Sequence, residues 1–169
     1  MILTDGLQPE GVTMIFQDSV FMMPHLGVLS TIYPDAAWNI FDKDCLLRLG
    51  SIIAPKGMVK SGELVMEIEL EMEDGSIMNE VVKGGEIKKI ELGNRKTALA
   101  TILPSKNFDI GNGYGKELVT KVEGGIVGII FDGRGRPITF EDNEEIQKEQ
   151  LLDWLKTLEM YPENLLEEV

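Results

Sequence analysis

The chain has 169 residues, of which 43% are hydrophobic, and its 29 acidic and 16 basic residues give a formal net charge of −13. A chain of this length can bury roughly 70% of its unfolded surface in one compact domain. The acidic balance disfavours nucleic acid and anionic lipid as partners. Because the longest apolar runs are far shorter than the roughly 20 residues of a membrane span, and the N-terminus lacks a signal-peptide pattern, we expect no membrane partner and a cytoplasmic protein.

The sequence contains one cysteine, Cys45, and one histidine, His25. An internal disulfide is therefore impossible, and no Cys/His set has the spacing of zinc ligands. We expect Cys45 to be a small buried residue at the end of a helix and His25 to be partly buried. A catalytic triad would have to use His25, and no GxSxG elbow is present, so we expect no catalytic residue, no metal and no cofactor.

Residues 1–45 are predicted to form a mostly helical N-terminal region. A turn-rich opening, DGLQPEG, leads into a short strand at 12–16. A helix capped by Asp18 or Ser19 follows, and a second short helix begins at Pro34.

Between residues 46 and 140 the hydrophobic period changes to two, which is typical of strands. The run ELVMEIELEME places apolar side chains on one face and glutamates on the other, so we expect one buried and one solvated face. The apolar side chains are Leu64, Met66, Ile68, Leu70 and Met72. Asp74 and Gly75 then favour a tight hairpin. Other strands are predicted at 46–55, 76–82, 86–92, 97–103, 116–124 and 125–131. At least seven short strands at these spacings predict a mainly β (α+β) fold, an antiparallel β-barrel or sandwich.

The C-terminal segment 141–162 returns to a helical pattern. Asp142 and Glu145 have the spacing of a capping box, and apolar residues then recur at helical spacing as far as Pro162. We expect this helix to pack one stripe against the sheet. The predicted organisation is therefore a single domain over 1–169.

The most glycine-rich segment is FDIGNGYGK, residues 108–116. It is not a phosphate-binding loop of the Walker type, because Ile110 stands where that loop needs glycine and Glu117 stands where it needs serine or threonine. We expect a wide turn whose glycines adopt positive φ values.

The segment GGIVGIIFDGRGRPITF, residues 124–140, contains an arginine–glycine pattern like that of hooks that bind the DNA minor groove. Such hooks are basic and flexible, whereas this segment lies in an acidic protein, so we expect no DNA binding. We interpret 132–137 as a hairpin turn with Pro137 on the returning strand. Gly124, Gly125 and Gly128 are expected to allow close backbone approach.

Five sequence blocks, in order, resemble the C-terminal part of the glutamate mutase (methylaspartate mutase) accessory protein family, the L component of methylaspartate mutase operons. The blocks are DGLQPEGVTMI, LGVLSTIYPDAAWNIF, LRLGSIIAPKG, FDIGNGYGK and VEGGIVGIIFDGRGRPITF, which cover most of residues 5–140. The resemblance implies a fragment of a larger protein whose N-terminal half is an ATPase of the actin and sugar-kinase type. It further implies a non-catalytic interaction domain of a reactivating, chaperone-like protein. Its partner would be an adenosylcobalamin-dependent mutase or the missing ATPase half.

The expected interaction site combines the two glycine-rich turns. If they lie at one end of the β domain, Lys116, Arg134 and Arg136 form an exposed cationic rim for a carboxylate or phosphate on a partner. The candidate binding residues are Gly111, Gly113, Gly115, Lys116, Asp132, Arg134 and Arg136.

Two alternatives remain open on the sequence. One is a small-molecule-binding or enzymatic β domain with a site built around the turns at 109–116 and 132–137, for instance from Asp109, Asp132 and Arg134. The other is a purely structural domain that completes the fold of the missing half.

Overall fold

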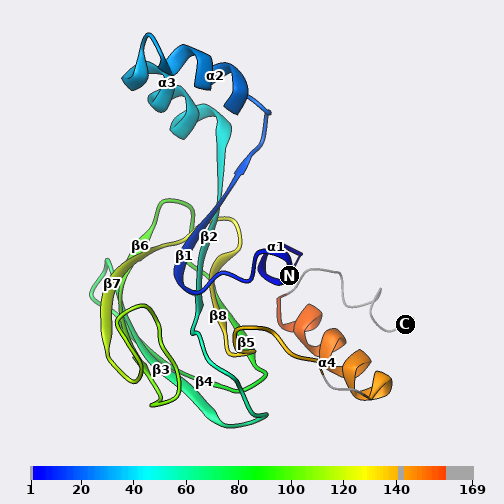
Figure 1. The fold of residues 1–169 in the computed structure, drawn as a ribbon. Helices are drawn as coiled ribbons and strands as arrows, with labels where there is room; N and C mark the ends of the chain where they lie inside the picture. Colours follow the sequence, from blue (N-terminus) through cyan, green and yellow to red (C-terminus); the bar gives the residue numbers. More distant parts are fainter. Residues whose placement is uncertain (1, 141–142, 159–169) are drawn as a thin grey trace.

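The computed structural model describes residues 2–140 and 143–158 and contains two four-stranded sheets that pack face to face (Figure 1). The strand order is β1-β2-β8-β5 in the first sheet and β4-β3-β6-β7 in the second. The mainly β fold is confirmed. Of the two predicted architectures the sandwich is correct, because the sheets do not close into a barrel.

The strands follow the predicted positions closely. Their bounds are β1 Gly11–Asp18, β2 Leu46–Ala54, β3 Leu64–Met72, β4 Ile77–Lys83, β5 Ile87–Ile90, β6 Thr97–Pro104, β7 Leu118–Glu123 and β8 Gly128–Asp132. The hairpin at Asp74 and Gly75 joins β3 to β4, and Gly75 has the expected positive φ of 82°.

One strand pair departs from the antiparallel prediction. β2 and β8 run parallel, with Gly50 opposite Gly128 and Ile53 opposite Phe131. β8 is buried at every position and β2 is buried from Gly50 to Ala54, so buried and exposed residues do not alternate in these stretches. The glycines predicted to allow close approach do so here: a Cβ on Gly125 would lie 2.5 Å from the Arg48 carbonyl oxygen.

The register of β3 corrects one predicted core residue. Met66, Ile68 and Leu70 are buried as expected, but Leu64 is exposed and Val65 is buried. The pairing of β3 with β4 is irregular between Leu64 and Met66, and such a bulge turns the side chain before it to the other face.

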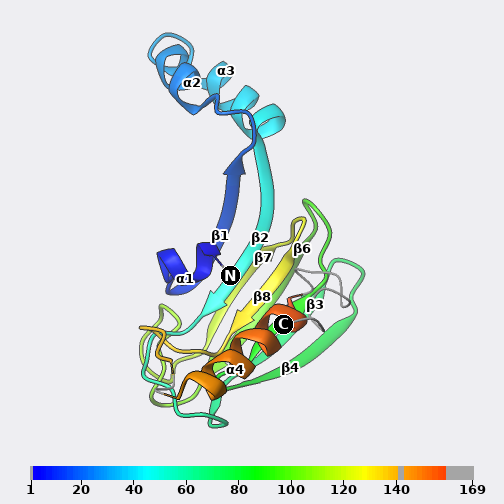
Figure 2. The ribbon, with the colours of Figure 1, turned by 90° about the vertical axis from the view of Figure 1, so that its right-hand side faces the viewer.

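The main core lies between the two sheets. The first sheet contributes Ile53, Ile129 and Phe131, and the second contributes the inward side chains of β3, β4, β6 and β7. A second, smaller cluster lies on the outer face of the first sheet, where Trp154 and Leu158 of the C-terminal helix pack against Ile52, Ala54, Ile87 and Ile130. The predicted packing of that helix on the sheet is therefore confirmed, as Figure 2 shows.

The helices are α1 Ile2–Leu7, α2 Met23–Ser30, α3 Pro34–Ile40 and α4 Glu144–Thr157, with a π-helical turn at Phe41–Cys45 after α3. The turn-rich opening predicted for residues 5–11 was wrong for its first three residues, because α1 extends to Leu7. Asp142 lies outside the described residues, and α4 is capped by the side chain of Asn143, whose oxygen accepts hydrogen bonds from the backbone N–H groups of Glu145 and Ile146.

The two predicted N-terminal helices, α2 and α3, do not pack on the sandwich. β1 and β2 extend as a two-stranded ribbon, paired as far as Asp18 and Leu46, and carry α2 and α3 at its far end (Figures 1 and 2). We call residues 19–45 the arm.

Candidate functional site

Asp132, Arg134 and Arg136 form a buried ion network at the end of β8. The side chain of Arg134 donates from Nε to Asp132 Oδ1 at 2.9 Å and from Nη2 to Oδ2 at 2.8 Å. Arg136 Nη2 donates to the same Oδ2 at 2.9 Å. The backbone N–H of Arg134 also donates to Oδ1, at 3.0 Å, so the carboxylate holds the turn in shape as well as pairing the cations.

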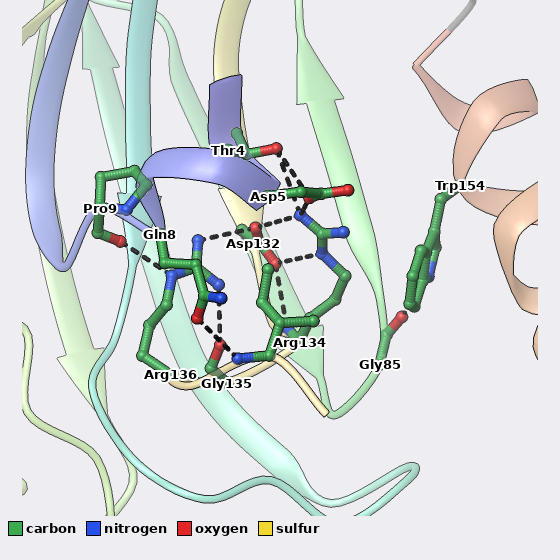
Figure 3. Close-up of polar contacts among 11 residues, drawn as sticks. Thr4, Asp5, Gln8, Pro9, Gly85, Asp132, Arg134, Gly135, Arg136 and Trp154 are labelled. Atoms are coloured by element: carbon green, nitrogen blue, oxygen red, sulfur yellow. Dashed lines mark hydrogen bonds and ion pairs between the residues drawn. The ribbon is translucent and has the colours of Figure 1, made fainter. Parts of the chain in front are cut away.

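Distant segments complete this network (Figure 3). On one side Arg134 Nη2 contacts Asp5 Oδ1 at 2.8 Å and Thr4 Oγ1 at 3.3 Å, both on α1. On the other, its guanidinium lies over the ring of Trp154 in α4, 4.8 Å from the centroid. Arg136 Nε donates to the Pro9 carbonyl oxygen at 2.9 Å. The network therefore joins both ends of the described chain to the sheet.

The exposed cationic rim predicted for this end of the molecule is wrong for both arginines. Arg134 is 3% exposed and Arg136 is 4% exposed, because α1, Trp154 and Pro9 cover them. The predicted hairpin at 132–137 is also wrong. Within the described residues no strand returns after β8; the chain instead bridges from Arg136 to Gly57 and continues to α4.

The charges of this network are mutually stabilising. Burial alone would favour a neutral Asp132, but the hydrogen bonds and positive charges of Arg134 and Arg136 outweigh it and hold the pKa of that carboxyl below its ordinary value. In the same way burial opposes ionisation of Arg134, yet Asp132 and Asp5 raise the pKa of its guanidinium. Asp132 and Arg134 thus stay charged in the folded chain, and their role is to link the segments that they contact.

The glycine-rich loop is organised around Asp109. Its Oδ1 accepts the backbone N–H groups of Gly111 at 2.7 Å and Gly113 at 2.8 Å, which hold the pKa of Asp109 below its ordinary value. Gly111, Gly113 and Gly115 all have positive φ, as predicted. Because an internal carboxylate already occupies these N–H groups, the loop has the character of a structural turn. Lys116 is exposed beside it.

The two predicted turns do converge. Lys56 forms a β-bridge with Asp109, and the next residue, Gly57, forms one with Arg136. The predicted proximity is therefore correct, while the predicted presentation of the arginine side chains is not.

The remaining polar candidates offer little chemistry. Within residues 2–140 and 143–158 no group of three or more His, Cys, Asp or Glu side chains is arranged to hold a metal ion, and none of the helices there is long and apolar enough to cross a membrane. Cys45 is buried as predicted, and burial raises the pKa of its thiol. His25 is exposed on α2, so its predicted partial burial is wrong.

The arm carries a large exposed apolar surface. Its large side chains include Phe21, which is 83% exposed, and Trp38, which is 62% exposed. Met23, Val28, Ile32 and Tyr33 are also exposed. Between α2 and α3 lies a groove of about 270 Å³, lined almost wholly by apolar groups that include Leu26, Ala37 and Trp38. Sequence reasoning found both helices but not this surface, because helical spacing of apolar residues does not show whether a helix packs on the sheet.

Ion pairs fix the base of the arm to the sandwich. Arg48 of β2 pairs with Asp42 of the arm and, at 3.2 Å, with Glu123 of β7, and its guanidinium lies over the ring of Phe16. Arg95 adds a contact to Asp42 at 3.6 Å. The arm is thus held in a defined direction where it leaves the sheets.

Comparison of the chain with protein-family models, with curated proteins and with solved structures finds no match.

Proposed function

We propose that this chain is a non-catalytic protein-interaction domain whose binding element is the arm, and that it serves an accessory protein that reactivates or chaperones an adenosylcobalamin-dependent mutase. The observation that carries the interaction role is the apolar surface of the arm, displayed on a ribbon away from both cores. Exposed apolar patches rimmed by polar residues mark interaction sites, and aromatic side chains such as Trp38 dominate binding at them.

The chemistry of the arm indicates the kind of partner. Residues 19–45 contain three acidic side chains, Asp35, Asp42 and Asp44, and one lysine, Lys43. A matching surface would have an apolar centre and a basic border. The choice of the mutase rests on the order of the five sequence blocks. On this proposal the protein acts in the cytoplasm, where an unpaired thiol such as that of Cys45 stays reduced.

The alternative of an enzymatic site at the turns 109–116 and 132–137 has less support. The carboxylates that such a site would use are already occupied, Asp109 by backbone N–H groups and Asp132 by two arginines. The structural alternative, in which the domain only completes an ATPase half, becomes an outcome of the test.

The proposal predicts that polar substitutions on the arm weaken mutase binding. The double variant Ile32→Ser/Trp38→Ser should bind purified adenosylcobalamin-dependent glutamate mutase at least about tenfold more weakly, as expected for loss of interface anchors. The matched control is Ile77→Ser/Tyr114→Ser on the sandwich, since Ile77 and Tyr114 are 60% and 58% exposed, close to the 68% and 62% of the arm residues.

Calorimetric titration of both variants and of the unaltered chain measures this directly. Equal affinity of the two double variants would contradict the role of the arm. Failure of the unaltered chain to bind the mutase would contradict the mutase as partner, and binding to a separately produced ATPase half would then identify the structural alternative.

A further inference from the structure

A second cavity, of about 300 Å³, lies on the outer face of the first sheet, between α1 and the C-terminal end of α4. Its apolar walls include Ile15, Leu49, Ile52, Ile87, Ile130 and Leu158. Ile126 and Val127 also line it and are exposed, so they mark the side on which it opens. A mostly apolar cavity of this volume is within the range of small-ligand sites.

Arg134, which lines this cavity, has one buried nitrogen atom that lacks a hydrogen-bond acceptor among the described residues. This atom is Nη1, and the other guanidinium nitrogens are paired. Figure 3 shows this third nitrogen pointing away from Asp132, towards the side of the sheet where Trp154 lies. A buried charged donor without a partner costs free energy, and an acceptor placed beside it recovers that cost.

The charge of Arg134 favours an anionic acceptor. Its Nε and Nη2 atoms are bound to Asp132 and Asp5, whereas Nη1 lacks an acceptor among the described residues. A carboxylate oxygen on Nη1 would make a charge-assisted hydrogen bond, which is shorter and stronger than one to a neutral acceptor.

The volume of the cavity limits the size of the apolar part of a ligand. At about 30 Å³ for each water-sized group, the cavity holds roughly ten such groups. We propose that this cavity is a binding site for a medium-chain aliphatic monocarboxylate, with the carboxylate on Arg134 Nη1 and the chain against the sheet. The site goes beyond the proposed function and does not depend on the arm.

Titration of the unaltered chain with octanoate, and separately with 1-octanol, tests the assignment. Octanoate should bind at least about tenfold more tightly than the alcohol, because only the carboxylate meets the guanidinium with charge. In nitrogen-15 NMR spectra the side-chain Nη signal of Arg134 should shift with octanoate and not with octanol. No binding of octanoate, or equal binding of both compounds without a shift, would overturn the proposal.

Two variants separate the cavity from nonspecific binding without touching the buried network. Ile15→Trp fills part of the cavity and should reduce octanoate affinity at least about tenfold, whereas Leu99→Trp, on the outer face of the second sheet, should leave it unchanged. If Ile15→Trp and Leu99→Trp behave alike, octanoate binds elsewhere and the site is wrong.

Discussion

At the scale of single residues, Asp132 is the point at which three distant parts of the chain are tied together. Its carboxylate holds Arg134 and Arg136, and these in turn contact α1, Pro9 and the ring of Trp154. A buried carboxylate with two arginine partners is stabilising only as a set, because removing one member leaves the others charged and desolvated.

Asp132→Asn should therefore destabilise the fold by about 3–5 kcal/mol. Asp5→Asn is the matched control: Asp5 also contacts Arg134 but its side chain is 31% exposed, so its loss should cost at most about 1 kcal/mol. Urea unfolding of both variants measures the two free energies. A loss below about 1 kcal/mol for Asp132→Asn would contradict the structural role of the network.

The pH dependence of stability follows from the direction of the Asp132 shift. Its pKa in the folded chain lies below the unfolded value of about 3.9, so between those values the unfolded chain binds more protons. The stabilisation is fully present well above pH 4 and is lost as pH falls through the folded pKa. The free energy of unfolding, measured in urea from pH 7 to pH 3, should decline below about pH 5. A constant value down to pH 3 would contradict the assignment.

The sequence identified these residues but not their setting. The spacing of Asp132, Arg134 and Arg136 in a glycine-rich turn predicted that they lie together, and their burial was missed because the covering groups are remote. Asp5, Pro9 and Trp154 are separated from them by more than 17 positions, and no local pattern in the sequence links them. Substituting Arg134 or Arg136 would not test partner binding, because the loss of these buried side chains would perturb folding first.

At the scale of elements, the parallel pairing of β2 with β8 joins the two halves of the first sheet, β1 with β2 and β8 with β5. The strands approach so closely at Gly50 that a Cβ there would lie 1.8 Å from the Gly128 carbonyl oxygen, and Gly50 has a φ of 129°. Any side chain at this position would separate the strands.

Gly50→Ala should accordingly cost at least about 3 kcal/mol, combining backbone strain with steric overlap. Gly111→Ala is the matched control, because Gly111 also has positive φ, at 110°, but a Cβ at this position would have no neighbouring atom within 4 Å. It should cost on the order of 1 kcal/mol, the strain alone. Thermal and urea unfolding measure the loss of stability in both variants. Similar losses would show that the close approach of β2 and β8 does not matter for stability.

Most elements could be predicted because their hydrophobic periods are clear. The alternation in β3 and the paired turn residues Asp74 and Gly75 fixed that hairpin, and Pro34 marked the start of α3. The errors have identifiable causes. Leu64 was misplaced because a bulge interrupts the alternation, and α1 was missed because glycine and aspartate in a six-residue helix read as a turn.

At the scale of the whole molecule, the sandwich contains the hydrophobic cores and the arm carries an exposed apolar surface. Both hydrophobic clusters of the described residues lie in the sandwich and contain no residue of the arm. The arm instead keeps most of its large apolar side chains exposed and is anchored at its base by Asp42, Arg48 and Arg95. This division could not be predicted from periodicity, since the apolar residues of α2 and α3 read equally well as core.

Replacing residues 19–45 by the dipeptide Asn-Gly tests this division most directly. Asp18 and Leu46 are paired across the ribbon, so a two-residue turn can join them as a hairpin. The shortened protein should retain its free energy of unfolding within about 1 kcal/mol, as expected for changes outside the core. It should no longer bind the proposed mutase partner in calorimetric titration. Undiminished capture by the shortened, folded protein would contradict the account.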